Sequence, residues 1–229
     1  MLSNMAKNNC AGISSVLVFI TVILSLCGSI TSVKVTIYYE GLCYDSIKFI
    51  GQQLYPHWTQ LSPFVSLELV PYGKAIHNLN GNKYEFFCQH GSAECRSNKL
   101  QACLLNQNLG SVKDVSLVYC IMSSRNPGSF DIAVDCANEL GYNVKRFKKC
   151  ALTTEADNLL AQNGDKTSAL KPDLQFVPTI VYDDEYSKMH QDQSLIDFVA
   201  VVCSKLVQLN APKVCQNRQL PVIEPVIQF

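Results

Sequence analysis

The chain has 229 residues, of which 48% are hydrophobic, so it is long enough to bury the core of one globular domain. Its 19 lysine and arginine residues balance its 19 aspartate and glutamate residues, and this neutral total predicts no nucleic-acid partner and no binding to an anionic membrane. The eleven cysteines are the informative feature, because a secreted chain this rich in cysteine builds disulfides, whereas a cytosolic one binds metal.

The N-terminus distinguishes between these compartments. Lys7 precedes an apolar run over residues 13–27, which two small residues follow. This order predicts a cleaved signal peptide over residues 1–29 and no stable membrane association afterwards. The alternative, an uncleaved anchor, is disfavoured because the run is short and interrupted by serine and threonine. Cleavage removes Cys10 and Cys27 and leaves nine cysteines, an odd number that predicts one free or reactive thiol.

The first predicted elements of the mature chain are a strand and a helix that meet at a cysteine. Apolar side chains alternate over residues 33–39, the period of a strand with one buried face. Gly41 permits a turn, and helical spacing of apolar residues begins at Cys43. A thiol at a helix start lies among unpaired backbone N–H groups, which favour the nucleophilic thiolate. Cys43 is therefore the candidate reactive residue.

A second strand over residues 65–70 follows this helix, which predicts a strand–helix–strand unit with parallel strands. Residues 74–171 then form a predicted helical insertion that opens with a loop at residues 78–82. Five candidate helices follow: one from Ser92 to Leu109, one that begins at Ser111 and is broken at Asn126, one from about Phe130 to Leu140, one that includes Val144 to Ala151, and one that Thr153 caps. The pattern Ser111-Val-Lys-Asp114 resembles a capping box.

The sheet resumes at residues 176–182, where Pro178 opens a strand, and the final predicted helix spans about residues 193–206. In the thioredoxin fold, a redox cysteine opens the first long helix and a cis-proline before a later strand faces it. Cys43 and the Val177-Pro178 dipeptide match that arrangement. The chain thus resembles an α/β protein of this fold, with Val177 and Pro178 as candidate substrate-binding residues.

Residues 88–103 carry the most specific motif. They match the pattern C-Q-H-G-x-x-E-C-x-x-N-x-x-x-x-C at every fixed position, which is the signature of the gamma-interferon-inducible lysosomal thiol reductases. The chain is similar to this family over about residues 33–215. The resemblance implies a thioredoxin-like domain over residues 30–215, stabilised by disulfides, an activity that reduces protein disulfides, and a removable propeptide in residues 216–229.

The resemblance also places the two redox cysteines of the family at positions 43 and 46, and position 46 is a serine here. In a C-x-x-C enzyme the second thiol attacks the mixed disulfide and frees the substrate, which Ser46 cannot do. Its hydroxyl is expected to hydrogen-bond the Cys43 sulfur instead. Three alternatives remain open. Cys43 reduces disulfides as a monothiol with an external small thiol as reductant and no bound cofactor, which we favour; it traps or isomerises disulfides; or the chain is a catalytically weak binding protein.

The other eight cysteines of the mature chain are predicted to form four structural disulfides: Cys88, Cys95, Cys103, Cys120, Cys136, Cys150, Cys203 and Cys215. One pairing is predicted, Cys203 with Cys215, since a helix end and a returning tail bring them close. The alternative is a zinc site that joins His90 to the first three of these cysteines, but they lack a close C-x-x-C pair and the compartment favours disulfides. We therefore expect no metal, and a packing or hydrogen-bonding role for His90.

Entry to the secretory pathway predicts a secreted or lysosomal protein whose partners are disulfide-containing proteins. No N-x-[ST] sequon occurs in the chain, so N-glycan-dependent sorting to lysosomes has no attachment site. The two destinations therefore both stay open.

Overall fold

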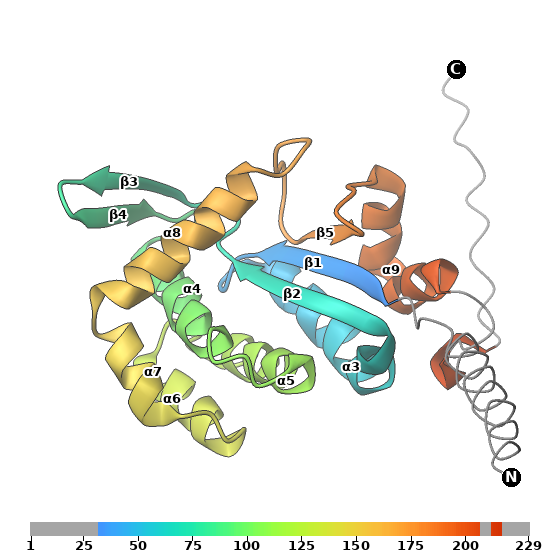
Figure 1. The fold of residues 1–229 in the computed structure, drawn as a ribbon, viewed down its shortest axis with the longest axis horizontal. Coiled ribbons are helices and arrows are strands. Elements are labelled where there is room, and N and C mark those ends of the chain that lie inside the picture. Colours follow the sequence, from blue (N-terminus) through green and yellow to red (C-terminus); the bar gives the residue numbers. More distant parts are fainter. Residues whose placement is uncertain (1–31, 207–211, 217–229) are drawn as a thin grey trace, which may run out of the picture. The chain divides into compact units, whose positions relative to one another are not determined.

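The computed structural model describes residues 32–206 and 212–216, so the predicted signal peptide and almost all of the predicted propeptide lie outside the described residues. A three-stranded sheet with the order β2–β1–β5 carries the fold (Figure 1). Strand β1 (Val33–Tyr39) lies between β2 (Val65–Pro71), to which it is parallel as predicted, and β5 (Thr179–Tyr182), to which it is antiparallel.

The helical segment after β1 is longer than its apolar spacing predicts. Helix α2 (Tyr44–Phe49) runs through a π-helical turn at Ile50–Leu54 into helix α3 (Tyr55–Leu61). The buried side chains of this segment pack against β1 and against helix α9 (Lys188–Lys205) in the main apolar core. Because that packing fixes the start of α2, it also fixes Cys43 at the end of β1.

Helix α9 begins at Lys188 rather than at residue 193. The Ser187 side chain accepts a hydrogen bond from the His190 backbone N–H (3.4 Å) and so caps the helix earlier than the apolar spacing indicates. The prediction missed this start because the first turn of α9 is polar and carries no apolar periodicity. Asp197 has a non-helical φ of −146° and ψ of 82°, which interrupts the helix.

The insertion opens with a β-hairpin where the sequence predicted a loop at residues 78–82. Strands β3 (Ile76–Asn80) and β4 (Lys83–Phe87) pair antiparallel around a turn in which Gly81 has a φ of +59°. One face of the hairpin, which contains His77, Tyr84 and Phe86, packs toward helix α8. The loop prediction was wrong because asparagines disfavour strands locally, whereas this tertiary packing stabilises the hairpin.

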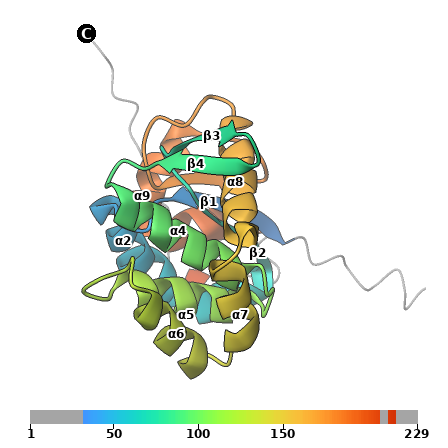
Figure 2. The ribbon, with the colours of Figure 1, turned by 90° about the vertical axis from the view of Figure 1, so that its left-hand side faces the viewer.

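Within the described residues, the predicted five helices complete the insertion: α4 (Ser92–Leu105), α5 (Ser111–Met122), α6 (Phe130–Glu139), α7 (Val144–Ala151) and α8 (Thr154–Ser168). Helices α4 and α8 pack side by side (Figure 2). The predicted Thr153 cap of α8 is present, since its hydroxyl accepts a hydrogen bond from the Glu155 backbone N–H.

Two predictions at helix ends were wrong. Helix α4 ends at Leu105 and not at residue 109, because the chain leaves the helix and Asn108 adopts a φ of +53°. Ser111 forms no capping box, since Gly110 occupies the N-cap position. Asp114, the other predicted member of the box, instead accepts a hydrogen bond from the Tyr142 hydroxyl at 2.7 Å.

Four disulfides cross-link the described residues. Three lie in the insertion, Cys88–Cys95, Cys103–Cys150 and Cys120–Cys136. The fourth, Cys203–Cys215, ties α9 to a short 3₁₀ turn at Lys213–Cys215, and it is the pairing that the sequence predicted. None of the helices in residues 32–206 and 212–216 is long and apolar enough to cross a membrane.

Candidate active site

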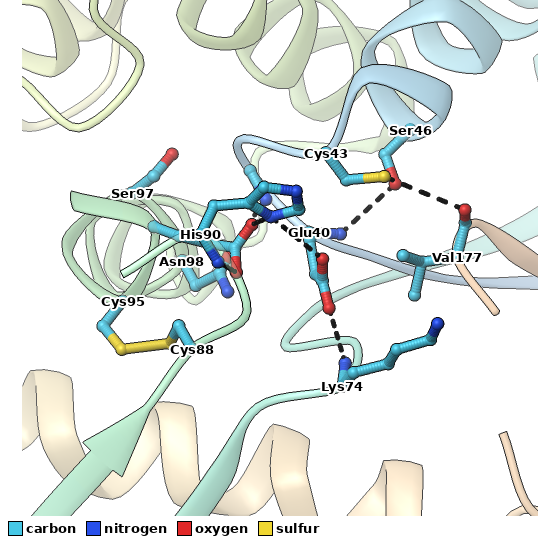
Figure 3. A network of polar contacts seen from close by, with 12 residues as sticks. Glu40, Cys43, Ser46, Lys74, Cys88, His90, Cys95, Ser97, Asn98 and Val177 are labelled. Atoms are coloured by element: carbon cyan, nitrogen blue, oxygen red, sulfur yellow. Dashed lines mark hydrogen bonds and ion pairs between the residues drawn. A yellow bond between two sulfur atoms is a disulfide. The ribbon is translucent and has the colours of Figure 1, made fainter. Parts of the chain in front are cut away.

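The Cys43 thiol lies where β1 ends and α2 begins. Cys43 is the N-cap residue of α2, has 9% of its surface exposed, and is the free cysteine among the described residues. Its sulfur lies 3.9 Å from the Val177 carbonyl oxygen, toward which the thiol donates (Figure 3). The start of the helix therefore presents the thiol to one backbone loop.

That loop contains the cis peptide bond between Val177 and Pro178 that the sequence predicted. The fully buried side chain of Gln191, from the first turn of α9, holds it in place. Gln191 Nε2 donates to the Pro178 carbonyl (3.0 Å), and Gln191 Oε1 accepts from the Ile180 backbone N–H (2.7 Å). Sequence analysis missed Gln191, because nothing in its local pattern signals a buried amide.

Ser46 lies one turn into α2 and is fully buried. Its hydroxyl oxygen accepts a hydrogen bond from the Glu40 backbone N–H at 3.4 Å. The hydrogen bond to the Cys43 sulfur that the sequence predicted is not among the contacts of Ser46 in the described structure, because the hydroxyl faces the turn before α2. With oxygen at position 46, no disulfide can form between positions 43 and 46.

Residues of the signature motif at positions 88–103 contact the turn between β1 and α2 on the side away from the Cys43 thiol. Glu40, three residues before Cys43, is fully buried, and its Oε1 accepts a hydrogen bond from the Lys74 backbone N–H at 2.7 Å. Its Oε2 has no hydrogen-bond partner and lies 3.4 Å from His90 Nδ1. The same Nδ1 lies 2.6 Å from Glu94 Oε2, and Glu94 is also fully buried. His90 is thus a hydrogen-bonding residue, as predicted.

Burial raises the pKa of the Glu40 carboxyl. The hydrogen bond from Lys74 opposes this upward shift, and the nearby Glu94 carboxylate adds to it. Sequence analysis missed Glu40, because its partners at positions 90 and 94 are distant along the chain. The only available signal was an acidic residue directly after an apolar strand.

Two further contacts fix the turn to the middle of helix α4. Asn98, another fixed position of the signature, accepts a hydrogen bond from the Gly41 backbone N–H at 2.8 Å. A Cβ atom at Gly41 would lie 2.3 Å from the Ser97 hydroxyl oxygen, so only glycine allows this close approach. The Cys88–Cys95 disulfide then links the end of the hairpin to the same helix. The signature therefore positions the Cys43 turn and leaves the thiol itself free.

The fold and this geometry define a thioredoxin-like protein with a free cysteine opposite a cis-proline. A solved structure of Chlamydia trachomatis DsbA has the same fold, with a TM-score of 0.52 at 12% sequence identity over 72% of this chain and 86% of that chain. At this identity the similarity concerns the fold alone.

The family follows from sequence comparison. The model of the family described as "Gamma interferon inducible lysosomal thiol reductase (GILT)" matches residues 34–140. The chain is 34% identical over 202 residues to a gamma-interferon-inducible lysosomal thiol reductase-like protein of Anopheles gambiae, covering 83% of each chain. It is 35% identical over 185 residues to the gamma-interferon-inducible lysosomal thiol reductase of Carassius auratus, covering 80% of this chain and 72% of that one. The chain belongs to the GILT family.

Proposed function

We propose that the chain is a thiol reductase that reduces disulfides of other proteins through the thiolate of Cys43. One observation carries this proposal. Cys43 is the free cysteine of the described residues and faces the cis Val177–Pro178 loop, whereas the other eight cysteines there are paired. Family membership agrees with this assignment, since the relatives are named thiol reductases.

The chemistry is a thiol–disulfide exchange. The Cys43 thiolate attacks one sulfur of the substrate disulfide, a mixed disulfide forms, and the second substrate sulfur leaves as a thiolate that takes up a proton. The Val177 and Pro178 backbone lies beside the sulfur, where an extended substrate segment would bind. Because Cys43 is 9% exposed, we expect flexible or unfolded substrates to reach it more readily than rigid ones.

Release of the substrate needs an external thiol, because Ser46 carries no sulfur. One small-thiol molecule attacks the mixed disulfide at the Cys43 sulfur and frees the first substrate sulfur, the one that was bound to Cys43. A second molecule then attacks the new adduct and regenerates the Cys43 thiolate. The substrate gains two electrons and two protons, and the two small thiols leave as one oxidised disulfide. In this cycle the Ser46 hydroxyl keeps its contact with the Glu40 backbone N–H.

Ser46 and the small exposed surface of Cys43 also favour a second candidate, a binding protein or a disulfide trap with little turnover. We further propose that the protein works in the secretory pathway, either secreted or in lysosomes. The four disulfides and the lysosomal names of relatives support this location.

The test is reduction of a disulfide-bonded protein by the wild type, Cys43→Ser and Ser46→Cys, with and without added glutathione. The proposal predicts turnover by the wild type only with glutathione, and none by Cys43→Ser. It also predicts that Ser46→Cys depends less on glutathione, because the second sulfur is held close at high effective concentration. Wild-type activity no greater than that of Cys43→Ser, combined with activity in Ser46→Cys, would favour the binding protein instead.

A further inference from the structure

Three ligand-type side chains converge behind the turn that carries Cys43: Glu40, His90 and Glu94. Figure 3 shows Glu40 and His90 pointing toward each other beside this turn. One ligand atom each of Glu40, His90 and Glu94 lies within 4.8 Å of the other two. Glu40 comes from the end of β1 and Glu94 from the first turn of α4, and both side chains are fully buried. The His90 side chain is 40% exposed, so the cluster is open to solvent on one side.

The charge of this cluster is not balanced by its own members. Two buried carboxylates face one imidazole, which carries at most one positive charge. Glu94 is satisfied, because its oxygens pair with the His90 backbone N–H at 3.2 Å and with Nδ1 at 2.6 Å. Glu40 Oε2 is buried without a hydrogen-bond partner and points at Nδ1 from 3.4 Å. A buried carboxylate in this position needs a cation or a proton beside it.

We infer that Glu40, His90 and Glu94 form a binding site for a divalent transition-metal ion of the zinc type. One imidazole nitrogen and two carboxylate oxygens neutralise such an ion and leave a fourth position for water on the exposed side of His90. An imidazole ligand favours zinc over calcium or magnesium, which prefer oxygen ligands alone.

The distances fit an ion after one small movement. Tetrahedral ligand atoms at about 2.0–2.1 Å from zinc lie roughly 3.3 Å from each other. The separation of Nδ1 from Glu40 Oε2 is already 3.4 Å. The separation of Nδ1 from Glu94 Oε2 is 2.6 Å, a hydrogen bond that opens when the ion displaces the Nδ1 proton.

This ligand set differs from the alternative zinc site considered in the sequence analysis. That site used His90 with Cys88, Cys95 and Cys103, and all three of those cysteines are paired in disulfides. The carboxylates take their place only in the folded chain. The inference therefore revises our expectation that the protein binds no metal.

An ion at this site would act on the reactive turn without touching the thiol. The Glu40 backbone accepts a hydrogen bond from the Cys43 N–H and donates one to Ser46 Oγ, both at 3.4 Å. A metal bond to the Glu40 carboxylate would therefore restrain the turn from behind. The binding itself does not depend on the proposed reductase activity.

The experiment is calorimetric titration of Zn²⁺ into the mature, oxidised Cys43→Ser protein. This background removes the free thiol as a competing ligand and is inactive under the proposed mechanism, so the binding result and the activity result are independent. We expect one Zn²⁺ per chain. Glu94→Gln should weaken binding by about tenfold or more, since even loss of a residue behind a metal ligand costs this much. The matched control Glu85→Gln, at an exposed carboxylate of β4, should bind as the background does.

Circular dichroism checks that each variant folds. If Glu94→Gln does not fold, His90→Gln serves in its place, because the His90 side chain is partly exposed and its loss disturbs the core less. The inference is overturned if the background protein takes up no Zn²⁺ at stoichiometric concentration, which would leave a proton as the counter-charge of Glu40. It is equally overturned if the folded variant, Glu94→Gln or His90→Gln, binds with unchanged affinity.

Discussion

The sheet region and the insertion are stabilised in different ways. The sheet region comprises β1, β2, β5, α2, α3 and α9, and its core is a large cluster of apolar side chains around β1. In the insertion, residues 74–171, the main cluster is smaller, and three of its buried members, Cys103, Cys136 and Cys150, are disulfide cysteines. Three of the four disulfides among the described residues lie in the insertion, whereas the free cysteine lies in the sheet region.

The difference indicates how a free thiol is kept in a protein rich in disulfides. The sheet region buries the larger apolar cluster, and its one disulfide among the described residues, Cys203–Cys215, joins α9 to the short turn at Lys213–Cys215. The insertion buries the smaller apolar cluster, and its three disulfides compensate. Cys43 therefore lies among β1, β2, β5, α2 and α3, which no disulfide of the described residues joins to one another.

Loss of the longest disulfide should have the largest effect on stability. Cys103 and Cys150 are 47 residues apart, and the loop-entropy relation assigns about 4 kcal/mol to closing such a loop. The double variant Cys103→Ala/Cys150→Ala should therefore lose about 4 kcal/mol in the free energy of unfolding, measured with urea. Cys43→Ser, which cuts no disulfide, should stay within about 1 kcal/mol of the wild type. Equal stability of the double variant and the wild type would show that the insertion does not need its cross-links.

A smaller effect is expected at the joint between the two regions. The buried Tyr39 hydroxyl of β1 donates to Gln101 Oε1 of α4 at 2.7 Å. Tyr39→Phe leaves that oxygen buried without a partner and should cost about 1–2 kcal/mol. Tyr44→Phe, at a side chain that is 74% exposed, is the matched control and should cost nothing measurable. If the two variants melt alike, the Tyr39–Gln101 hydrogen bond contributes little to the coupling of the two regions.

The smallest effect concerns pH and lies within the insertion. Burial raises the pKa of the Asp114 carboxyl, although the hydrogen bond from Tyr142 opposes this shift. The unfolded chain loses the Asp114 proton at the ordinary pKa of 3.8, whereas the folded protein keeps this proton to a higher pH. Its stability contribution therefore falls as pH rises from 3.8 through the folded pKa, and the loss is complete above that value.

Asp114→Asn removes this titration and keeps an oxygen acceptor for the Tyr142 hydroxyl. The free energy of unfolding of the variant, measured with urea, should therefore rise relative to that of the wild type between about pH 4 and about pH 7. Asp157→Asn, at a carboxylate on α8 that pairs with Lys99, is a control in which no gain is expected. A constant difference between wild type and Asp114→Asn across this range would contradict the raised pKa.

The sequence predicted the reactive turn from local patterns, and the cis-proline from the resemblance to the thioredoxin fold. Alternating apolar residues define β1, helical spacing begins at Cys43, and a proline precedes β5. The β3–β4 hairpin was missed, since its polar strands are stabilised by packing toward α8. Local patterns carry no signal of that kind.

The partners of the site were harder to predict than its centre. Glu40 contacts a residue 34 positions away and Asn98 one 57 positions away, and nothing in the local pattern around Gln191 signals a buried amide. The same limit applies to the cysteines. Cys203–Cys215 was predictable because the two residues are 12 positions apart at the end of a helix, whereas Cys103–Cys150 requires the packing of α4 against α7.

The central claim is that Cys43 acts as a lone thiol. The most direct measurement is alkylation of the mature protein under denaturing, non-reducing conditions, followed by peptide mapping. We predict that Cys43 is the single alkylated cysteine, or that it is recovered as an adduct with a small thiol, and that the eight other mature cysteines are found in disulfides. Recovery of Cys43 in an internal disulfide, with another cysteine alkylated in its place, would contradict both the free thiol and the monothiol mechanism.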